Sequence, residues 1–72
     1  MLTINMLETG NKIKNLRKLN KNKLQDIVDA CGVTPVAVCK WQSGKCLPTI
    51  DNLVILASLW NVKLDDIIVT NK

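Results

Sequence analysis

A chain of 72 residues is long enough for one domain and lies near the lower limit for a single hydrophobic core without disulfides or metals. Apolar residues make up 47% of it and its only aromatic side chains are two tryptophans, which favours an aliphatic, all-helical core. No apolar run approaches the roughly 18 residues that suggest a membrane span, and the first residues lack the charged start and long apolar run of a signal peptide. We therefore expect a cytoplasmic protein without a membrane segment.

The composition also argues against metal sites and catalysis. The three cysteines, Cys31, Cys39 and Cys46, form no CxxC pair and there is no histidine, so a zinc site would need a carboxylate to complete it. We interpret Cys31 and Cys39 as small, reduced residues of the core or its boundary, and Cys46 as an exposed thiol. Without histidine, tyrosine, a nucleophile–base pair or a glycine-rich phosphate loop, we expect neither an enzyme nor a cofactor or small-molecule ligand.

Residues 1–9 are predicted to form an N-terminal arm. Leu2, Ile4 and Met6 alternate with polar residues, which fits a short strand or an extended segment. An arm that enters a DNA minor groove usually carries Arg or Lys, and this one has neither. We expect it to pack against the domain or a second subunit.

A first helix is predicted from Thr9 or Gly10 to about Asn20, with Ile13, Leu16 and either Leu19 or Asn20 inward. The stretch 9–25 contains no acid, and neither does the stretch 30–50. The first carries six cations and the second two, and such surfaces attract a polyanion. The cations are Lys12, Lys14, Arg17, Lys18, Lys21 and Lys23, then Lys40 and Lys45.

Residues 24–48 have the pattern of two short helices joined by a tight turn. The first helix ends at Gly32, because glycine adopts a left-handed conformation without steric cost. Thr34 is an N-cap and Pro35 stands at the first helical position, so a second helix runs from Pro35 to about Ser43 and stops at Gly44. This is the pattern of a helix-turn-helix, whose second helix can enter a DNA major groove.

Two further helices are predicted. Thr49 caps a helix that ends near Asn61, with an inward stripe at Leu53, Leu56, Ala57 and Trp60. A last helix is predicted from Leu64 to about Val69, with Leu64, Ile67 and Ile68 inward.

Several residues recur at a family-specific spacing: Gly32-Val33-Thr34, Val38, Trp41, Gly44-Lys45, Leu47-Pro48-Thr49, Leu53 and Leu56-Ala57. Over residues 10–68 the chain resembles the phage Cro and repressor type of helix-turn-helix, also called lambda-repressor-like or xenobiotic-response-element-like. The resemblance implies a compact all-α domain of five helices over residues 10–70, with the helix-turn-helix formed by helices 2 and 3. It also implies a transcriptional repressor that binds a palindromic operator in double-stranded DNA as a homodimer.

The resemblance assigns the DNA contacts by position. The base-facing residues are Pro35, Val36, Ala37 and Lys40, of which only Lys40 can donate a hydrogen bond, most naturally to guanine. Phosphate contacts fall to Thr34, Gln42, Ser43 and Lys45 with the N–H groups near Gly44. As cations, Arg17 and Lys23 are further predicted phosphate contacts, which the resemblance does not supply. The chain departs from the family at Lys23 and Leu24, where relatives carry a Ser or Thr cap and a phosphate-binding Gln.

Three alternatives remain open at this level. Ile55, Leu59, Ile68 and Val69 are either the dimer surface or additional core. Trp41 is read as core, and its N–H can also reach a phosphate. The apolar run Pro35-Val36-Ala37-Val38, at a site that is usually polar, favours an alternative function as a protein-interaction module with weak or non-specific DNA binding.

Overall fold

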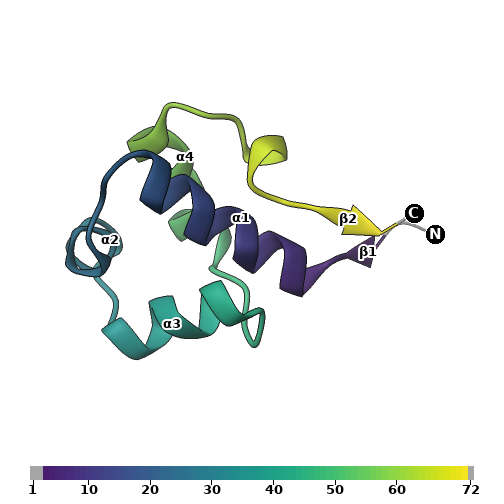
Figure 1. Cartoon of the computed structure of the whole chain (residues 1–72), viewed down its shortest axis with the longest axis horizontal. Coiled ribbons are helices and arrows are strands. Elements are labelled where there is room, and N and C mark those ends of the chain that lie inside the picture. Colours follow the sequence, from purple (N-terminus) through teal and green to yellow (C-terminus); the bar gives the residue numbers. More distant parts are fainter. Residues whose placement is uncertain (1–2, 72) are drawn as a thin grey trace.

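Four α-helices make up most of the part of the chain that the computed structural model describes, residues 3–71 (Figure 1). A short 3-10 turn, η1, and two strands of two residues each complete the fold. In chain order the elements are β1 (Thr3–Ile4), α1 (Met6–Leu19), α2 (Leu24–Cys31), α3 (Pro35–Ser43), α4 (Ile50–Trp60), η1 (Leu64–Asp66) and β2 (Thr70–Asn71). None of the helices within residues 3–71 has both the length and the apolar character that crossing a membrane requires.

Side-chain caps and left-handed residues set the helix ends. Thr34 Oγ1 accepts a hydrogen bond from Ala37 N–H (3.2 Å), which confirms the predicted N-cap of α3. Gly32 (φ 65°) and Gly44 (φ 79°) end α2 and α3 in the left-handed conformation, as predicted. The start of α1 was predicted wrongly. It begins at Met6 because Asn5 Oδ1 accepts from Glu8 N–H (2.9 Å), so residues 6–9 are helical.

The core lies between the helices and is formed by the side chains on their inward faces. Its buried members are Ile13, Leu16, Ile27, Val38, Trp41, Leu53, Leu56, Trp60 and Ile67. Trp41 is 5% exposed, which confirms its place in the core. Trp60 is equally buried, and its Nε1–H donates to Asn22 Oδ1 (2.8 Å), so the α1–α2 connection is tied to the end of α4. Leu19 is 79% exposed and Asn20 is exposed as well, so the prediction that one of the two faces inward is wrong.

The end of the chain differs from the prediction. The expected helix over 64–69 stops at Asp66, and five α-helices were therefore one too many. Val69 leaves the helical path because its N–H donates to Thr9 Oγ1 (2.9 Å) and its carbonyl accepts from Asn5 N–H (2.8 Å). The chain then forms β2, which pairs antiparallel with β1 in the register Thr3↔Asn71 and Ile4↔Thr70. A strand was one reading of the N-terminal alternation, and its residue Leu2 lies outside the described residues.

Helices α1 and α3 cross in close contact, and this contact fixes the position of α3 at the surface of the molecule. A Cβ atom at Gly10 would collide with the carbonyl oxygen of Trp41 and lie 2.8 Å from that of Gln42. At the other side of the contact, a Cβ at Gly44 would lie 2.8 Å from Leu7 Cα. Only glycine allows this approach, so α3 is held directly against the backbone of α1.

Candidate nucleic-acid interface

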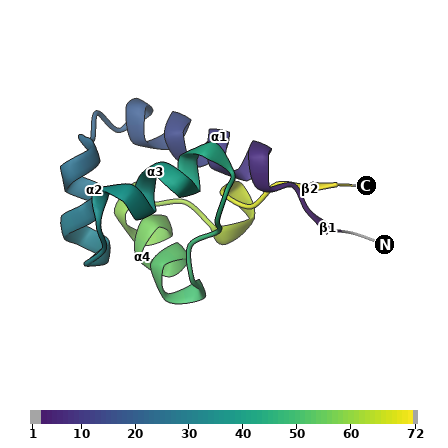
Figure 2. The same ribbon diagram turned by 90° about the horizontal axis from the view of Figure 1, so that it is seen from below.

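Helix α3 lies on the outside of the molecule and exposes one whole face (Figures 1 and 2). Val38 and Trp41 point into the core, and the helical period places Val36 and Lys40 outward, where both are exposed. Pro35 is exposed as well, because it stands at the first position of the helix. Of the four predicted base-facing residues, Ala37 alone is half-buried. The structure therefore brings three of them onto one accessible face.

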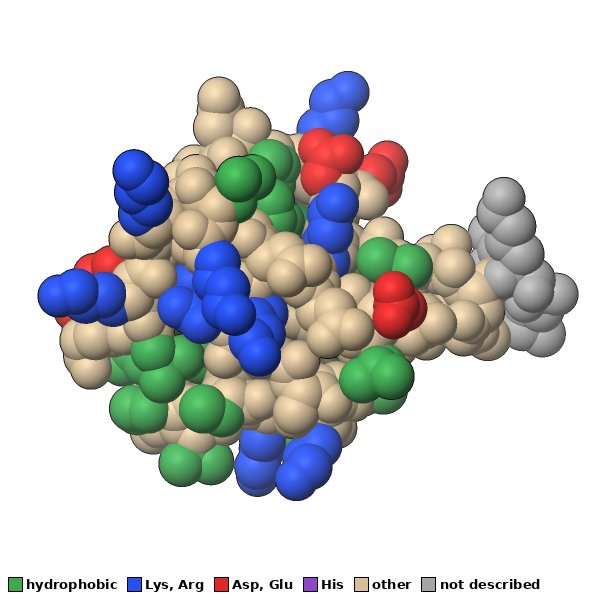
Figure 3. Space-filling view, viewed as in Figure 1, with side chains coloured by type: hydrophobic (Ala, Val, Ile, Leu, Met, Phe, Trp, Pro, Cys, Tyr) green, Lys and Arg blue, Asp and Glu red, His purple; other side chains and the backbone are tan. Residues whose placement is uncertain are grey.

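A shallow depression of about 480 Å³ runs along this face. It extends along α3 to the loop that follows this helix. Its lining consists of Pro35, Val36, Cys39, Lys40, Ser43 and Lys45. In Figure 3, basic side chains project from the lower edge of the molecule, where α3 lies, and further basic side chains lie over α1. A predicted base contact, Lys40, and a predicted phosphate contact, Lys45, thus meet at one opening.

Two predicted phosphate residues, Arg17 and Gln42, bind each other across the α1–α3 contact. Arg17 Nε–H donates to Gln42 Oε1 (2.9 Å), and its Nη1–H donates to the carbonyl of Asn22 (3.1 Å). Since an arginine only donates, this bond fixes which end of the Gln42 amide faces it. The Nε2 group of Gln42 is therefore the end left for another partner. The two residues are 25 positions apart, so no local pattern signals the pair.

The backbone amides near Gly44 are already hydrogen-bonded, so they do not form the phosphate clamp expected of them. Gly44 N–H donates to the carbonyl of Trp41 (3.2 Å), and the N–H groups of Lys45 and Cys46 donate to that of Lys40 (3.0 and 3.3 Å). Of the two predicted phosphate contacts at this end of α3, Lys45 presents a charged side chain, whereas Ser43 Oγ–H already donates to the carbonyl of Lys40 (3.2 Å). Both are exposed.

The start of α2 is unfavourable for a phosphate in one respect. Asp26 Oδ2 accepts from Lys23 N–H (2.7 Å), so a carboxylate already lies at the positive end of the helix. Lys23 itself is exposed and can act as a point charge. At the start of α3, Thr34 Oγ1 accepts from Ala37 N–H, and its hydroxyl hydrogen can still be donated.

The three cysteines are reduced and differ in exposure. Cys31 is half-buried, and its burial raises the pKa of the thiol above the ordinary value. Cys46 is exposed, as predicted. Cys39 is exposed as well, so its assignment to the core or its boundary is wrong. It lies one turn from Val36 and Ser43 on the outer face of α3.

The pair α2 and α3, with the turn from Gly32 to Thr34 between them, defines a helix-turn-helix fold. No family model matches the sequence, and no curated protein matches it either.

Solved structures do match. The restriction-modification controller protein C.AhdI from Aeromonas hydrophila aligns with a TM-score of 0.76 and 14% identity over 86% of this chain and 94% of its own. The clp gene regulator ClgR from C. glutamicum aligns with a TM-score of 0.74 and 14% identity over 86% and 80%. At this identity the likeness shows a shared fold, which agrees with the predicted all-α helix-turn-helix class.

Proposed function

We propose that this protein is a DNA-binding transcriptional regulator that inserts α3 into the major groove. The observation that carries the proposal is the exposed face of α3, which presents Lys40 and Lys45 and lies in a stretch, residues 30–50, without any acid. An α-helix fits the major groove, which is about 12 Å wide. The two structural neighbours are named a controller protein and a gene regulator, which supports the same class.

In this arrangement the base contacts are few. Lys40 donates to guanine O6 or N7, and Val36, which is 63% exposed, packs against a thymine methyl group. A good bidentate contact provides about 1–3 kcal/mol of discrimination, so one half-site of this kind specifies little. Phosphate contacts from Lys23, Thr34 and Lys45 supply most of the affinity. Sequence preference then also depends on DNA shape and on a second subunit.

The second subunit docks on α4. Ile50, Val54 and Leu59 are 68%, 52% and 42% exposed on this helix. A depression of about 430 Å³ lies beside them, lined by Ala30, Val54, Ile55, Ser58 and Leu59. The predicted dimer candidates Ile55 and Leu59 meet here. Ile68 and Val69 do not line this depression; Ile68 packs on the core and Val69 is bound to Thr9.

A homodimer formed by this face presents two α3 helices to a palindromic operator, and it represses by competing with polymerase for the promoter. Leu59→Lys is expected to convert the dimer to a monomer in analytical ultracentrifugation without lowering its helix content. A dimer that persists would reject this face.

The DNA-binding proposal is tested by titrating purified protein into labelled duplex DNA at about 50 and about 200 mM salt. The expected affinity falls steeply as salt rises. Lys45→Ala should flatten the slope of log K against log salt by about one unit. Lys40→Ala should relax the preference at one base position by a factor that corresponds to about 1–3 kcal/mol. No salt-dependent binding by the wild type would overturn the proposal.

One observation favours a second function, a protein-interaction module on the same fold. Pro35 and Val36 are exposed apolar residues at the start of α3, where a DNA reader would present polar groups. A protein that binds no duplex at low salt, and whose Val36→Asp variant loses a protein partner, would support this alternative.

A further inference from the structure

The depression beside the exposed face of α4 lies in an acidic part of the surface. It has a volume of about 430 Å³, and its lining is small or apolar: Ala30, Val54, Ile55, Ser58 and Leu59. Neither α2 nor α4, which supply this lining, contains a lysine or an arginine. The same two helices contain three aspartates, Asp26, Asp29 and Asp51. We call this hollow the α2–α4 depression.

Two of these aspartates lie beside the apolar lining. Asp51 precedes Val54 and Ile55 by three and four positions, so its side chain lies on the same side of α4 as theirs. Asp26 precedes Ala30 by four positions and shares its side of α2 in the same way. Asp26 and Asp51 are both exposed. The rim of the α2–α4 depression is therefore negative at both helices.

The hydrogen bonds of the acids on α2 leave their negative charge in place. Asp26 Oδ2 accepts from the backbone N–H of Lys23 (2.7 Å), and Asp29 Oδ1 accepts from the side-chain amide of Gln25 (2.8 Å). Both donor groups are neutral. The side chain of Lys23, which immediately precedes α2, does not line the depression. A cationic partner therefore gains an electrostatic attraction at this rim that a neutral partner does not.

A second copy of this chain matches the apolar lining but not the charge of the rim. In a two-fold dimer the same patch lies on both subunits, so acids face acids, and such like-charge contacts oppose association. The basic helix α1 of a second copy does not remove the mismatch, because its apolar side chains Ile13 and Leu16 are buried in the core. The occupant that suits both the hollow and its rim is a helix with an exposed apolar stripe and basic flanks.

We propose that the α2–α4 depression is a docking site for a basic amphipathic helix of another protein, and that this helix displaces the second subunit. The displacement rests on the proposed function, in which the same face holds the homodimer together. Apolar side chains of the partner fill the hollow, and its lysine or arginine side chains pair with Asp26 and Asp51. The acids thus weaken the contact between identical subunits and strengthen the contact with the partner. A protomer released from the dimer loses its second half-site on DNA.

A synthetic peptide tests the site directly. The probe is a helix of about 15 residues with leucine at positions i, i+3, i+4 and i+7 and lysine on its flanks. The control peptide carries glutamate in place of every lysine. Fluorescence anisotropy should show that the wild type binds the lysine peptide at least about tenfold more tightly than the glutamate peptide. Equal affinity for the two peptides would overturn the proposal.

Analytical ultracentrifugation tests the displacement. Saturation with the lysine peptide should convert the wild-type dimer into monomers. A dimer that persists with the peptide bound would show that the peptide occupies another surface, and would overturn the proposal.

Asp51→Asn tests the rim, because it removes one negative charge and keeps the size of the side chain. It should weaken binding of the lysine peptide about two- to fivefold and tighten the homodimer, since one like charge disappears from each subunit. A purely apolar docking face predicts neither change. Asp51 is exposed, so circular dichroism should show an unchanged helix content.

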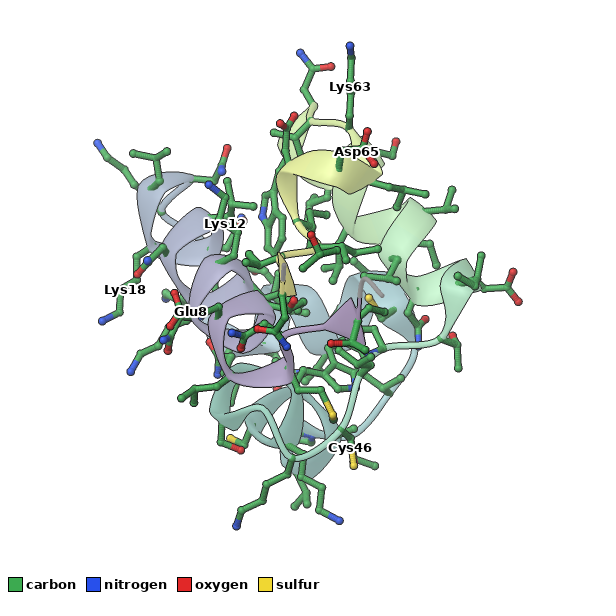
Figure 4. All side chains as sticks on the ribbon, turned by 90° about the vertical axis from the view of Figure 1, so that its right-hand side faces the viewer. Glu8, Lys12, Lys18, Cys46, Lys63 and Asp65 are labelled. Carbon is green, nitrogen blue, oxygen red and sulfur yellow. The ribbon has the colours of Figure 1, made fainter. Side chains whose placement is uncertain are left out.

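The matched control is Asp65→Asn. Asp65 is an exposed carboxylate on η1, at the same end of the molecule as Lys63 (Figure 4), and it does not line the α2–α4 depression. Its substitution removes the same charge and should change neither the peptide affinity nor the dimer. Equal effects of Asp51→Asn and Asp65→Asn would refute the role assigned to the rim.

Ionic strength separates the two occupants. Between about 0.1 and about 1 M salt the Debye length falls from about 10 to about 3 Å, which screens both attraction and repulsion. The peptide complex should weaken while the homodimer tightens, and Asp51→Asn should reduce both responses. A homodimer that weakens as salt rises would show that the acids do not face each other, and would overturn the displacement.

The outcomes separate this inference from the proposed function. A wild type without salt-dependent duplex binding removes the proposed function, whichever peptide it binds. A wild type that binds duplex DNA and does not distinguish the two peptides leaves that function in place and refutes the docking site.

Discussion

Replacing Gly10 by alanine is expected to force α1 away from α3. The added Cβ would collide with the carbonyl oxygen of Trp41 and lie 2.8 Å from the carbonyl oxygen of Gln42. Both oxygens belong to the backbone of α3, so neither can rotate out of the way as a flexible side chain would. The helices themselves must separate, and the core between them opens.

The magnitude follows from two opposing effects. Alanine is favoured over glycine inside a helix by about 1 kcal/mol, whereas overpacking a well-filled contact costs about 1–3 kcal/mol and occasionally more. Because the added Cβ clashes with backbone atoms, the cost of overpacking should be about 3 kcal/mol or more. The free energy of unfolding should therefore fall by roughly 2 kcal/mol or more. At about 0.05–0.15 kcal/mol per residue, a 72-residue domain has roughly 4–11 kcal/mol in total.

Urea unfolding followed by tryptophan fluorescence measures this loss, because Trp41 and Trp60 are each only 5% exposed in the folded protein. The control is Asn15→Ala, an exposed position of the same helix, which should be neutral or slightly stabilising. Duplex affinity should fall with Gly10→Ala as well, since α3 loses its support. A Gly10→Ala protein as stable as the wild type would refute the reasoning.

Two further predictions concern buried groups, and a third concerns the exposed thiol of Cys39. Asn22→Ala removes the acceptor of the Trp60 Nε1–H bond (2.8 Å) and should lower the free energy of unfolding by about 1–3 kcal/mol; an unchanged urea midpoint would contradict this. Because burial raises the pKa of the Cys31 thiol, a smaller fraction of this thiol is ionised at a given pH. Cys31 should therefore react more slowly with a thiol reagent than the exposed Cys39, and the pH dependence of its reaction rate should be shifted to higher pH. Equal rates in single-cysteine variants near pH 8 would contradict that pKa. Duplex DNA should protect Cys39 from the reagent, and unaltered reactivity of Cys39 in the complex would count against the α3 interface.

The helix-turn-helix was predictable from the sequence because its determinants are local. Gly32 and Gly44 end their helices by backbone conformation alone, and Thr34 caps α3 with a bond to a residue three positions away. The start of α1 carries a signal of the same kind, since Asn5 and Glu8 have the spacing of a cap and its partner.

The parts that were predicted wrongly depend on contacts between distant residues. The apolar pattern after Leu64 suits a helix, yet hydrogen bonds between Val69 and the residues Asn5 and Thr9, about 60 positions away, draw the chain into an extended path. The pairing of Arg17 with Gln42 depends in the same way on how α1 crosses α3. A sequence pattern identifies a cation and an amide, but only the packing shows that one orients the other.

The measurement that tests the central claim most directly is selection from a random duplex DNA library by the purified protein at about 50 and about 200 mM salt. The account predicts enrichment of a short palindrome whose half-sites lie about one helical turn apart, with affinity that falls steeply as salt rises. Lys40→Ala should select a less defined sequence at one position of each half-site. A protein that retains no duplex at either salt would contradict the insertion of α3 into the major groove.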